Sequence, residues 1–192
     1  MAKKKYKGRE NILVKKTAVL LYPQFSEYEL SVALSILMQG NKPIVTVGLT
    51  KQLIKGESGL SCIADSSIDE INLEEIDSLL LPGCMDVMSL KDEERLFDFL
   101  KKVTTKEKVI ASISSSPFLL AKAGILKGKK YTVGMTEEDM EIVGVFEKEN
   151  YSDELVVQDG NIITARGRGF IRFGTYLGKA LNLEFDERWY QE

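Results

Sequence analysis

Short apolar runs alternate with stretches of helical periodicity along most of the chain. The run TAVLLY at residues 17–22 is apolar almost throughout, as is typical of a strand buried on both faces of a sheet. The runs that predict strands are residues 17–22, 44–48, 76–81, 109–113 and 130–133. Apolar residues at helical spacing predict helices at residues 26–39, 92–103, 117–123 and 170–181.

Two further segments predict hairpins. Residues 56–65 have the pattern of a small hairpin or of a loop with one strand, and residues 154–165 fold back around Asp159-Gly160, a type I′ turn signal. The alternation of strand and helix predicts an α/β fold, in which a mostly parallel sheet carries helices on both faces. Ligands bind such sheets beyond the carboxyl ends of the strands, which directs attention to residues 23–29, 82–89 and 114–117.

The length and composition fit one medium-sized domain. The chain has 192 residues, of which 44% are hydrophobic and 29% charged. We expect a basic arm at residues 1–16 and a single domain at residues 17–192. No apolar run is long enough to span a bilayer, the basic start lacks the apolar core of a secretory signal, and two cysteines are too few for a disulfide framework. These features predict a cytoplasmic protein without a membrane partner.

The charge is unevenly distributed along the chain. There are 26 basic and 29 acidic side chains, but residues 1–16 alone carry a net charge of +6, which leaves −9 for the remainder. A basic arm can bind nucleic acid or an anionic surface, and the alternative is a solvated, frayed terminus. Because the acidic remainder repels phosphate and carries no aromatic-basic stripe, we expect no nucleic-acid partner.

The chain contains no histidine. This absence excludes every Ser-His or Cys-His catalytic couple and every metal site built on histidine. We expect neither a metal ion nor a cofactor.

The segment VIASISSSP at residues 109–117 has the pattern of a nucleophile elbow. A buried strand runs into small residues and then into a helix start, and so tight a turn needs small neighbours two residues either side of its tip. With Ser114 at the tip, those neighbours are Ser112 and Ser116. The alternative is that the three serines cap the helix that begins at Pro117.

Five stretches, in order along the chain, carry a resemblance to a known family. They are YPQFSEYE at residues 22–29, LLPGC at 80–84, SISSSP at 112–117, AGILKGKKYT at 123–132 and DGNIITARG at 159–167. From about residue 17 to residue 181 the sequence resembles the ThiJ/PfpI superfamily, which is related to class I glutamine amidotransferases. The resemblance implies a flavodoxin-like three-layer sandwich and, as is frequent in this family, a homodimer.

The resemblance also implies the position of the nucleophile. The family's elbow residue is usually a reactive cysteine beside a carboxylic acid, and the matching residues here are Ser114 and Glu29. The family's histidine, where present, matches Ser115 or Gly134. Glu29 has a second interpretation, because Ser26-x-x-Glu29 is also a capping-box pattern.

Three segments around the elbow match the walls of the family's pocket. Backbone N–H groups of Cys84 and Ser115 match its oxyanion hole, and Gly83, Arg166 and Gly167 border it. Cys84 stands where the family's Leu-Pro-Gly-Gly turn has its second glycine. It is either a relocated reactive thiol that faces the elbow or a partly buried small residue.

A serine at the elbow changes the expected chemistry. A thiol titrates near pH 8.5, whereas a hydroxyl needs a matched general base, and a carboxylate with an ordinary pKa of about 4.3 is a weak one. We therefore expect a family member with a degenerate site, which binds a small molecule or has a stress-associated role without the family's cysteine-dependent deglycase, glyoxalase or oxidation-sensing chemistry. One alternative is a hydrolase or amidase that uses Ser114, Glu29 and the oxyanion hole. Another is a structural or oligomeric protein without a pocket ligand.

Overall fold

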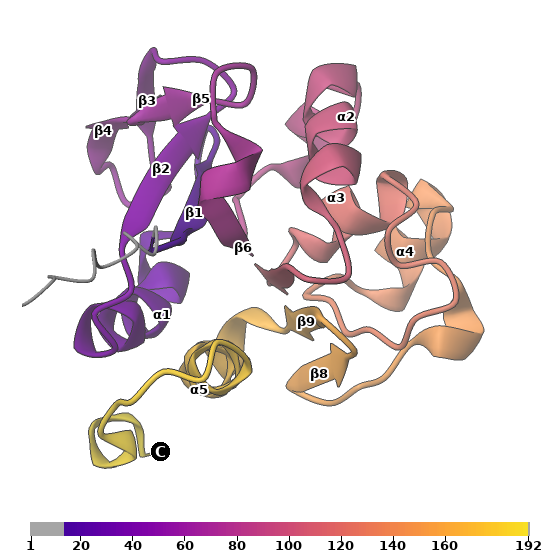
Figure 1. Ribbon diagram of the computed structural model, residues 1–192. Coiled ribbons are helices and arrows are strands. Elements are labelled where there is room, and N and C mark those ends of the chain that lie inside the picture. The colour runs from indigo at the N-terminus through magenta and orange to yellow at the C-terminus, as the bar shows by residue number, and fades with distance from the viewer. Residues whose placement is uncertain (1–13, 192) are drawn as a thin grey trace, which may run out of the picture.

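The computed structural model describes residues 14–191, and the first thirteen residues of the expected basic arm lie outside this range. Helices and strands alternate in the described part of the chain (Figure 1). The strands are β1 (Lys16–Leu21), β2 (Ile44–Gly48), β3 (Leu53–Lys55), β4 (Ser61–Ile63), β5 (Ser66–Ser67), β6 (Ile76–Leu81), β7 (Val109–Ile113), β8 (Val156–Asp159) and β9 (Ile162–Ala165). The α-helices are α1 (Glu27–Gln39), α2 (Glu94–Val103), α3 (Pro117–Lys122), α4 (Glu137–Val143) and α5 (Phe170–Ala180).

Seven strands form one mostly parallel sheet in the order β5-β2-β1-β6-β7-β9-β8. Only the β8–β9 pair is antiparallel within this sheet, and β3 and β4 form a separate antiparallel hairpin. The register aligns Leu81 of β6 with Ser112 of β7, and Ile113 of β7 with Ala165 of β9. Because neighbouring parallel strands end together, the segments that follow β1, β6, β7 and β9 meet at one edge of the sheet.

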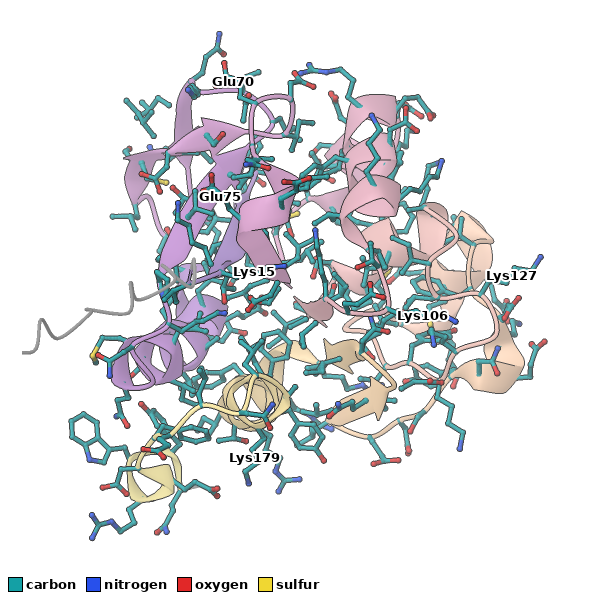
Figure 2. All side chains as sticks on the ribbon, in the orientation of Figure 1. Lys15, Glu70, Glu75, Lys106, Lys127 and Lys179 are labelled. Atoms are coloured by element: carbon teal, nitrogen blue, oxygen red, sulfur yellow. The ribbon has the colours of Figure 1, made fainter. Side chains whose placement is uncertain are left out.

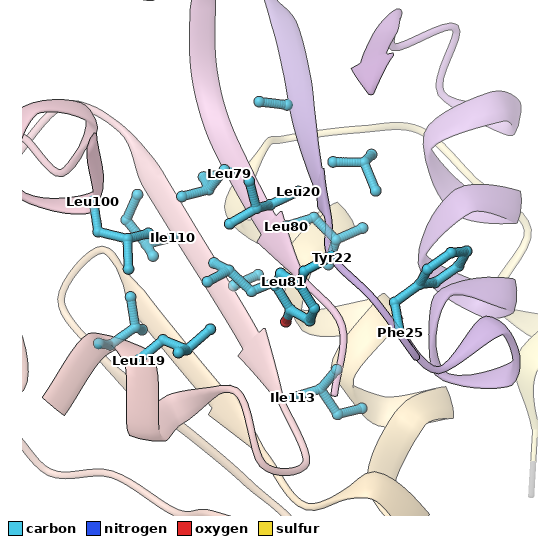
Figure 3. Close-up of a cluster of buried hydrophobic side chains, with 14 of the residues drawn as sticks. Leu20, Tyr22, Phe25, Leu79, Leu80, Leu81, Leu100, Ile110, Ile113 and Leu119 are labelled. Carbon is cyan, nitrogen blue, oxygen red and sulfur yellow. The ribbon is translucent and has the colours of Figure 1, made fainter. Parts of the chain in front are cut away.

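Helices cover both faces of the sheet, as the sequence predicts. Helices α1 and α5 pack against each other on one face, while α2 and α3 lie on the other (Figure 1). The strands between these layers are almost wholly apolar, and Leu20, Leu80 and Ile110 have no exposed surface (Figure 3). Charged side chains such as Glu70, Lys127 and Lys179 lie on the outside (Figure 2). The predicted flavodoxin-like fold is therefore confirmed.

Most of the predicted elements lie within one or two residues of their expected bounds. The prediction of a strand at residues 130–133 is wrong. Tyr131 forms only an isolated bridge with Tyr151. The N–H of Thr132 donates to the side-chain oxygen of Thr164 in β9 at 2.9 Å, rather than to a backbone carbonyl of that strand. Both sides of β9, the adjacent strand, are already paired with β7 and β8, so no ladder position on β9 remains for this segment.

Two smaller features also differ from the sequence prediction. The hairpin at residues 154–165 forms, but only Gly160 of its two loop residues has a positive φ, whereas a type I′ turn needs two. Helix α4 was not predicted, because Met140 is its one buried residue and its sequence EEDMEIV has little apolar periodicity. Thr136 caps this helix by accepting the N–H of Asp139 at 3.1 Å.

Within residues 14–191, no helix combines the length and the apolar character needed to cross a membrane.

Candidate functional site

Ser114 forms the tip of the turn between β7 and α3, which we call the elbow turn (residues 112–117). Its φ is 63°, in the left-handed region that side-chain-bearing residues rarely adopt. The backbone is held there from both sides: the Ser114 N–H donates to the Ala165 carbonyl at 2.8 Å, and its own carbonyl accepts the N–H of Gly134 at 2.6 Å. Such a conformation costs on the order of 1–2 kcal/mol and persists only where the surroundings enforce it.

The serines on either side of Ser114 support the turn from inside the protein. Ser112 and Ser116 are fully buried, and their hydroxyl oxygens lie 2.8 Å apart. Ser116 Oγ also accepts the N–H of Ile113 at 3.0 Å and lies 3.0 Å from the Leu81 carbonyl oxygen. Although Ser116 occupies the N-cap position of α3, its side chain makes no capping hydrogen bond. The alternative that these serines merely cap the helix is therefore wrong.

Glu29 lies in the first turn of α1 and is only 2% exposed. Its Oε2 accepts the N–H of Gly83 at 2.8 Å, which ties α1 to the turn after β6. The N–H of Ser26 donates to the Gly83 carbonyl at 2.8 Å, and the Ser26 hydroxyl donates to Glu57 at 2.7 Å. The capping-box interpretation of Ser26 and Glu29 is therefore wrong, and the carboxyl is directed into the sheet edge.

Two glycines allow Glu29 and Ser114 to approach each other. A Cβ atom on Gly83 would lie 2.5 Å from Glu29 Oε2 and 2.8 Å from Ser114 Oγ. A Cβ atom on Gly167 would lie 2.6 Å from Glu29 Oε1 and 3.2 Å from Ser114 Oγ. Real Cβ atoms essentially never lie closer than 3.0 Å to another atom, so a side chain at either position would force its neighbours to shift. The structure thus brings four of the predicted site residues together.

The environment of Glu29 changes its proton affinity. Burial raises the pKa of its carboxyl above the ordinary value, and this effect exceeds the opposing interactions with the Ser114 hydroxyl and the Gly83 N–H. The carboxyl is therefore more basic than an exposed glutamate, but it also retains its proton to a higher pH.

Cys84 and Ser115 form two hydrogen bonds with each other beside the elbow turn. The Cys84 N–H donates to Ser115 Oγ at 3.2 Å, and the Ser115 hydroxyl donates to the Cys84 carbonyl at 3.1 Å. The Cys84 side chain is 9% exposed, and burial together with the charge of Asp86 raises the pKa of its thiol to about 12. The structure therefore favours the partly buried small residue over the reactive thiol at this position.

The two arginines beside Gly167 are not brought together. Arg166 Nη2 donates to the Tyr151 hydroxyl at 2.5 Å, and its buried Nε has no hydrogen-bond partner among the described residues. Arg168 is exposed. The backbone of Arg166 nevertheless positions Gly167, because its N–H donates to the Leu155 carbonyl at 2.9 Å.

With this geometry established, comparison with known proteins identifies the family. The DJ-1/PfpI family model matches residues 15–178. The chain belongs to the DJ-1/PfpI family. The ThiJ/PfpI resemblance of the sequence is thereby confirmed at the level of the family and the fold.

Individual members of the DJ-1/PfpI family are moderately similar to this chain. "Deglycase PfpI" of Pyrococcus furiosus is 32% identical over 148 residues, which cover 76% of this chain and 86% of the relative. An uncharacterised protein of Methanocaldococcus jannaschii is 31% identical over 90% of this chain and 85% of its own length. A solved protein of Anabaena variabilis with a DJ-1/ThiJ/PfpI-like and a ferritin-like domain has a TM-score of 0.78 at 26% identity, over 93% of this chain and 52% of that one. The chain thus spans about half of that two-domain protein.

Sequence reasoning overlooked Tyr28, which also lies at the DJ-1/PfpI site. Its hydroxyl donates to Glu29 Oε1 at 3.3 Å, and a Cβ atom on Gly167 would lie 3.2 Å from Tyr28 Oη. The ring packs edge-to-face on Phe170 of α5, with centroids 5.6 Å apart. The sequence feature that could have indicated Tyr28 is its position next to Glu29 in the first turn of a predicted helix, because that turn faces the edge of the sheet.

In residues 14–191 no three acidic or cysteine side chains come close enough to hold a metal ion. The expectation that the protein uses no metal and no cofactor stays a prediction.

Proposed function

We propose that this DJ-1/PfpI protein binds a small polar molecule at the site formed by Ser114, Glu29, Gly83 and Gly167, without thiol chemistry. The observation that carries the proposal is the chemistry of the elbow turn: its tip bears a hydroxyl, next to a buried carboxyl that already accepts a backbone N–H. In this proposal Ser114 stands where most members of the family have their reactive cysteine.

Neither cysteine of the chain compensates for that replacement. Burial and Asp86 raise the pKa of Cys84 to about 12, so almost none of it is thiolate at neutral pH. Burial also raises the pKa of Cys62, which belongs to the β3–β4 hairpin. The activity named for "Deglycase PfpI" is therefore not carried over to this chain in the proposal.

If the site were catalytic, deprotonation of the Ser114 hydroxyl by Glu29 would be its least favourable step. A serine nucleophile needs a base that takes its proton at neutral pH. Glu29 is the carboxyl that interacts with the Ser114 hydroxyl. Its raised pKa makes its carboxylate a stronger base, but only in the molecules in which it is ionised. A site that binds and orients a ligand requires no such proton transfer.

A hydrolase or amidase that uses Ser114 is the second candidate. It is favoured by the left-handed backbone of Ser114, which is typical of a nucleophile elbow. In its disfavour, the Cys84 N–H expected in the oxyanion hole donates to Ser115 Oγ. The Ser115 side chain would have to rotate away before that N–H could bind an oxyanion.

Two labelling reactions separate these candidates. The protein is incubated with a fluorophosphonate and, separately, with iodoacetamide, and the adducts are located by mass spectrometry, with Ser114→Ala as the matched control. We expect no phosphonylation of Ser114 and only slow alkylation of either cysteine. A fluorophosphonate adduct on Ser114, absent from Ser114→Ala, would overturn the binding proposal in favour of the hydrolase.

The homodimer, the cytoplasmic location, the stress-associated role and the division at residue 16 stay predictions. Sedimentation of the full chain tests the dimer directly.

A further inference from the structure

A cavity of about 210 Å³ lies beside helix α4, and none of the four residues that form the Ser114 site lines it. Phe146 and Tyr151, which follow α4 in the sequence, form part of its wall together with Tyr131. Met140 of α4 adds an apolar thioether to the lining. The cavity therefore has room for a small molecule and offers it a mostly apolar surface.

The aromatic part of the wall is held in place from behind. Tyr131 is buried, and its ring stacks on Phe146 with centroids 5.2 Å apart and lies 5.9 Å from the ring of Tyr151. The hydroxyls of both tyrosines bond to groups that do not line the cavity: Tyr131 donates to the Glu147 carbonyl at 3.3 Å, and Tyr151 accepts from Arg166. A ligand in the cavity thus meets the partly buried rings of Phe146 and Tyr151 rather than free hydroxyl groups.

The charged side chains of the lining carry a net negative charge. Glu137 and Glu141 are four residues apart on α4 and therefore share one face of the helix. Lys148, the one cation of the lining, forms an ion pair with Glu141. Among residues 14–191, Glu137 has neither an ion-pair nor a hydrogen-bond partner. A cation beside Glu137 would relieve the repulsion between the two carboxylates of α4.

Carboxylates beyond the lining add to this negative charge. Burial, Tyr151, Glu149 and Glu147 raise the pKa of Tyr131 to about 12, so its phenol is neutral at physiological pH. Because the two glutamates act on a ring of the cavity wall, an anionic ligand would be repelled there as well.

A cation with an apolar surface matches both properties of the cavity. A primary ammonium has three N–H donors that need acceptors, and the aromatic wall offers none. A methylated ammonium has few or no N–H groups, and its positive charge is attracted both to aromatic faces and to a carboxylate.

We propose that the cavity beside α4 binds a small methylated ammonium compound, whose cationic group lies against Phe146 and Tyr151 and next to the carboxylate of Glu137. The inference is independent of the proposed function, because no residue of the Ser114 site takes part in it. Glu137 also lies in the first turn of α4, where a carboxylate stabilises a helix without any ligand. The test must therefore measure binding rather than stability.

A matched pair of ligands tests the proposal. Choline is compared with its neutral analogue, in which a tert-butyl group replaces the trimethylammonium group at nearly the same size and shape. Each is titrated into the full-length protein with isotope-labelled methionine methyl groups, and the NMR signal of Met140, assigned with Met140→Leu, reports on the cavity.

Three variants accompany the two ligands. Glu137→Gln removes the unpaired carboxylate, and Glu138→Gln is the matched control, since Glu138 is the next residue of α4 and does not line the cavity. Phe146→Leu replaces the ring with an apolar side chain. Because Glu137 and Glu138 are exposed, their variants keep the test valid even if Phe146→Leu does not fold.

We expect choline to shift the Met140 signal and to bind about five- to tenfold more tightly than the neutral analogue. Glu137→Gln and Phe146→Leu should each weaken choline binding about two- to fivefold, whereas Glu138→Gln should bind choline as the wild type does. Absence of a Met140 shift, or equal affinity for the two ligands, would overturn the proposal. An equal loss in Glu137→Gln and Glu138→Gln would show an effect of overall charge and overturn the assigned position of the cation. An equal loss of both ligands in Phe146→Leu would overturn its contact with the cation.

Discussion

Two turns at the same edge of the sheet carry Ser114 and Cys84, the two candidate nucleophiles. The surroundings of the two side chains differ. The elbow turn holds Ser114 in a left-handed conformation, with its hydroxyl beside Glu29. The turn after β6 (residues 82–84, the β6 turn) holds Cys84 with its thiol buried and its N–H bonded to Ser115. The sulfur atom is therefore in surroundings that suppress its reactivity, while the left-handed elbow position carries an oxygen atom.

This difference shows that the reactivity of a side chain at this edge of the sheet depends on the turn that holds it. A cysteine in the neighbouring β6 turn is not made reactive by lying near the elbow turn. Burial and Asp86 hold the pKa of Cys84 at about 12, although it lies one residue from the glycine that contacts Glu29. At the elbow turn, by contrast, the backbone has the left-handed conformation typical of a nucleophile elbow, and the side chain is a hydroxyl. The fold thus places a hydroxyl near a buried carboxyl at the elbow turn and keeps the thiol of Cys84 in surroundings that raise its pKa.

The largest effect is expected from closing the space between the two turns. Gly83→Ala places a Cβ atom 2.5 Å from both Glu29 Oε2 and Ser114 Cβ, so we expect a loss of about 1–3 kcal/mol in the free energy of unfolding, as for overpacked cores. Urea denaturation measures the loss. In a Ser114→Gly background part of the clash disappears, so Gly83→Ala should cost less there. Equal costs in the two backgrounds would contradict the contact between the turns.

The next effect concerns the buried carboxyl. Because burial raises the pKa of Glu29 in the folded state, the folded protein binds this proton more tightly than the unfolded chain does. Its contribution to stability is therefore complete below the unfolded pKa, near pH 4.5, and declines as the pH rises towards the folded pKa. The decline amounts to about 1.4 kcal/mol for each pKa unit between the two states.

Glu29→Gln removes that titration while keeping an acceptor for the Gly83 N–H. We expect the variant to gain stability relative to the wild type as the pH rises from about 4 to 7. Thermal unfolding at several pH values measures the difference, with Glu138→Gln on the exposed surface of α4 as the control. A relative gain for Glu29→Gln on lowering the pH would show that the carboxyl is stabilised in its charged form, contrary to this account.

The smallest effect tests the strain of the elbow turn. Glycine adopts a φ of 63° without steric cost, whereas alanine does not, and both variants lack the hydroxyl that interacts with Glu29, so Ser114→Gly should be more stable than Ser114→Ala by up to about 1 kcal/mol, after the entropy of the more flexible chain is subtracted. Ser115→Gly is the matched control, because Ser115 has no positive φ and bonds to Cys84. It should be less stable than Ser115→Ala. Equal stability of Ser114→Gly and Ser114→Ala would mean that Ser114 is not strained.

The apolar runs of the chain predict the sheet well, because strands buried on both faces leave a continuous signal. The four runs from residue 17 to residue 113 and the hairpin at residues 154–165 needed little more than this pattern. The segment at residues 130–133 has the same local character, yet β9 had no free edge for it. Local sequence does not encode which edges are already occupied.

The position of the site could also be predicted, whereas its hydrogen bonds could not. Ser114, Glu29 and Gly83 follow from strand ends and from the family resemblance, since the ends of parallel strands must meet. That Cys84 donates its N–H to Ser115, or that Tyr28 contacts Glu29, depends on side-chain directions across segments distant in sequence. Spacing along one segment carries no such information.

Alkylation of the introduced thiol in Ser114→Cys tests the central claim most directly. Wild type and variant are treated with iodoacetamide at neutral pH, and the rate at each cysteine is followed by mass spectrometry. A thiol with an ordinary pKa of about 8.5 carries roughly a thousandfold more thiolate than Cys84, whose pKa is about 12. We predict that position 114 in the variant reacts at least about tenfold faster than Cys84, which stays slow in both proteins. Fast alkylation of Cys84 in the wild type, or equally slow reaction at position 114, would contradict the account.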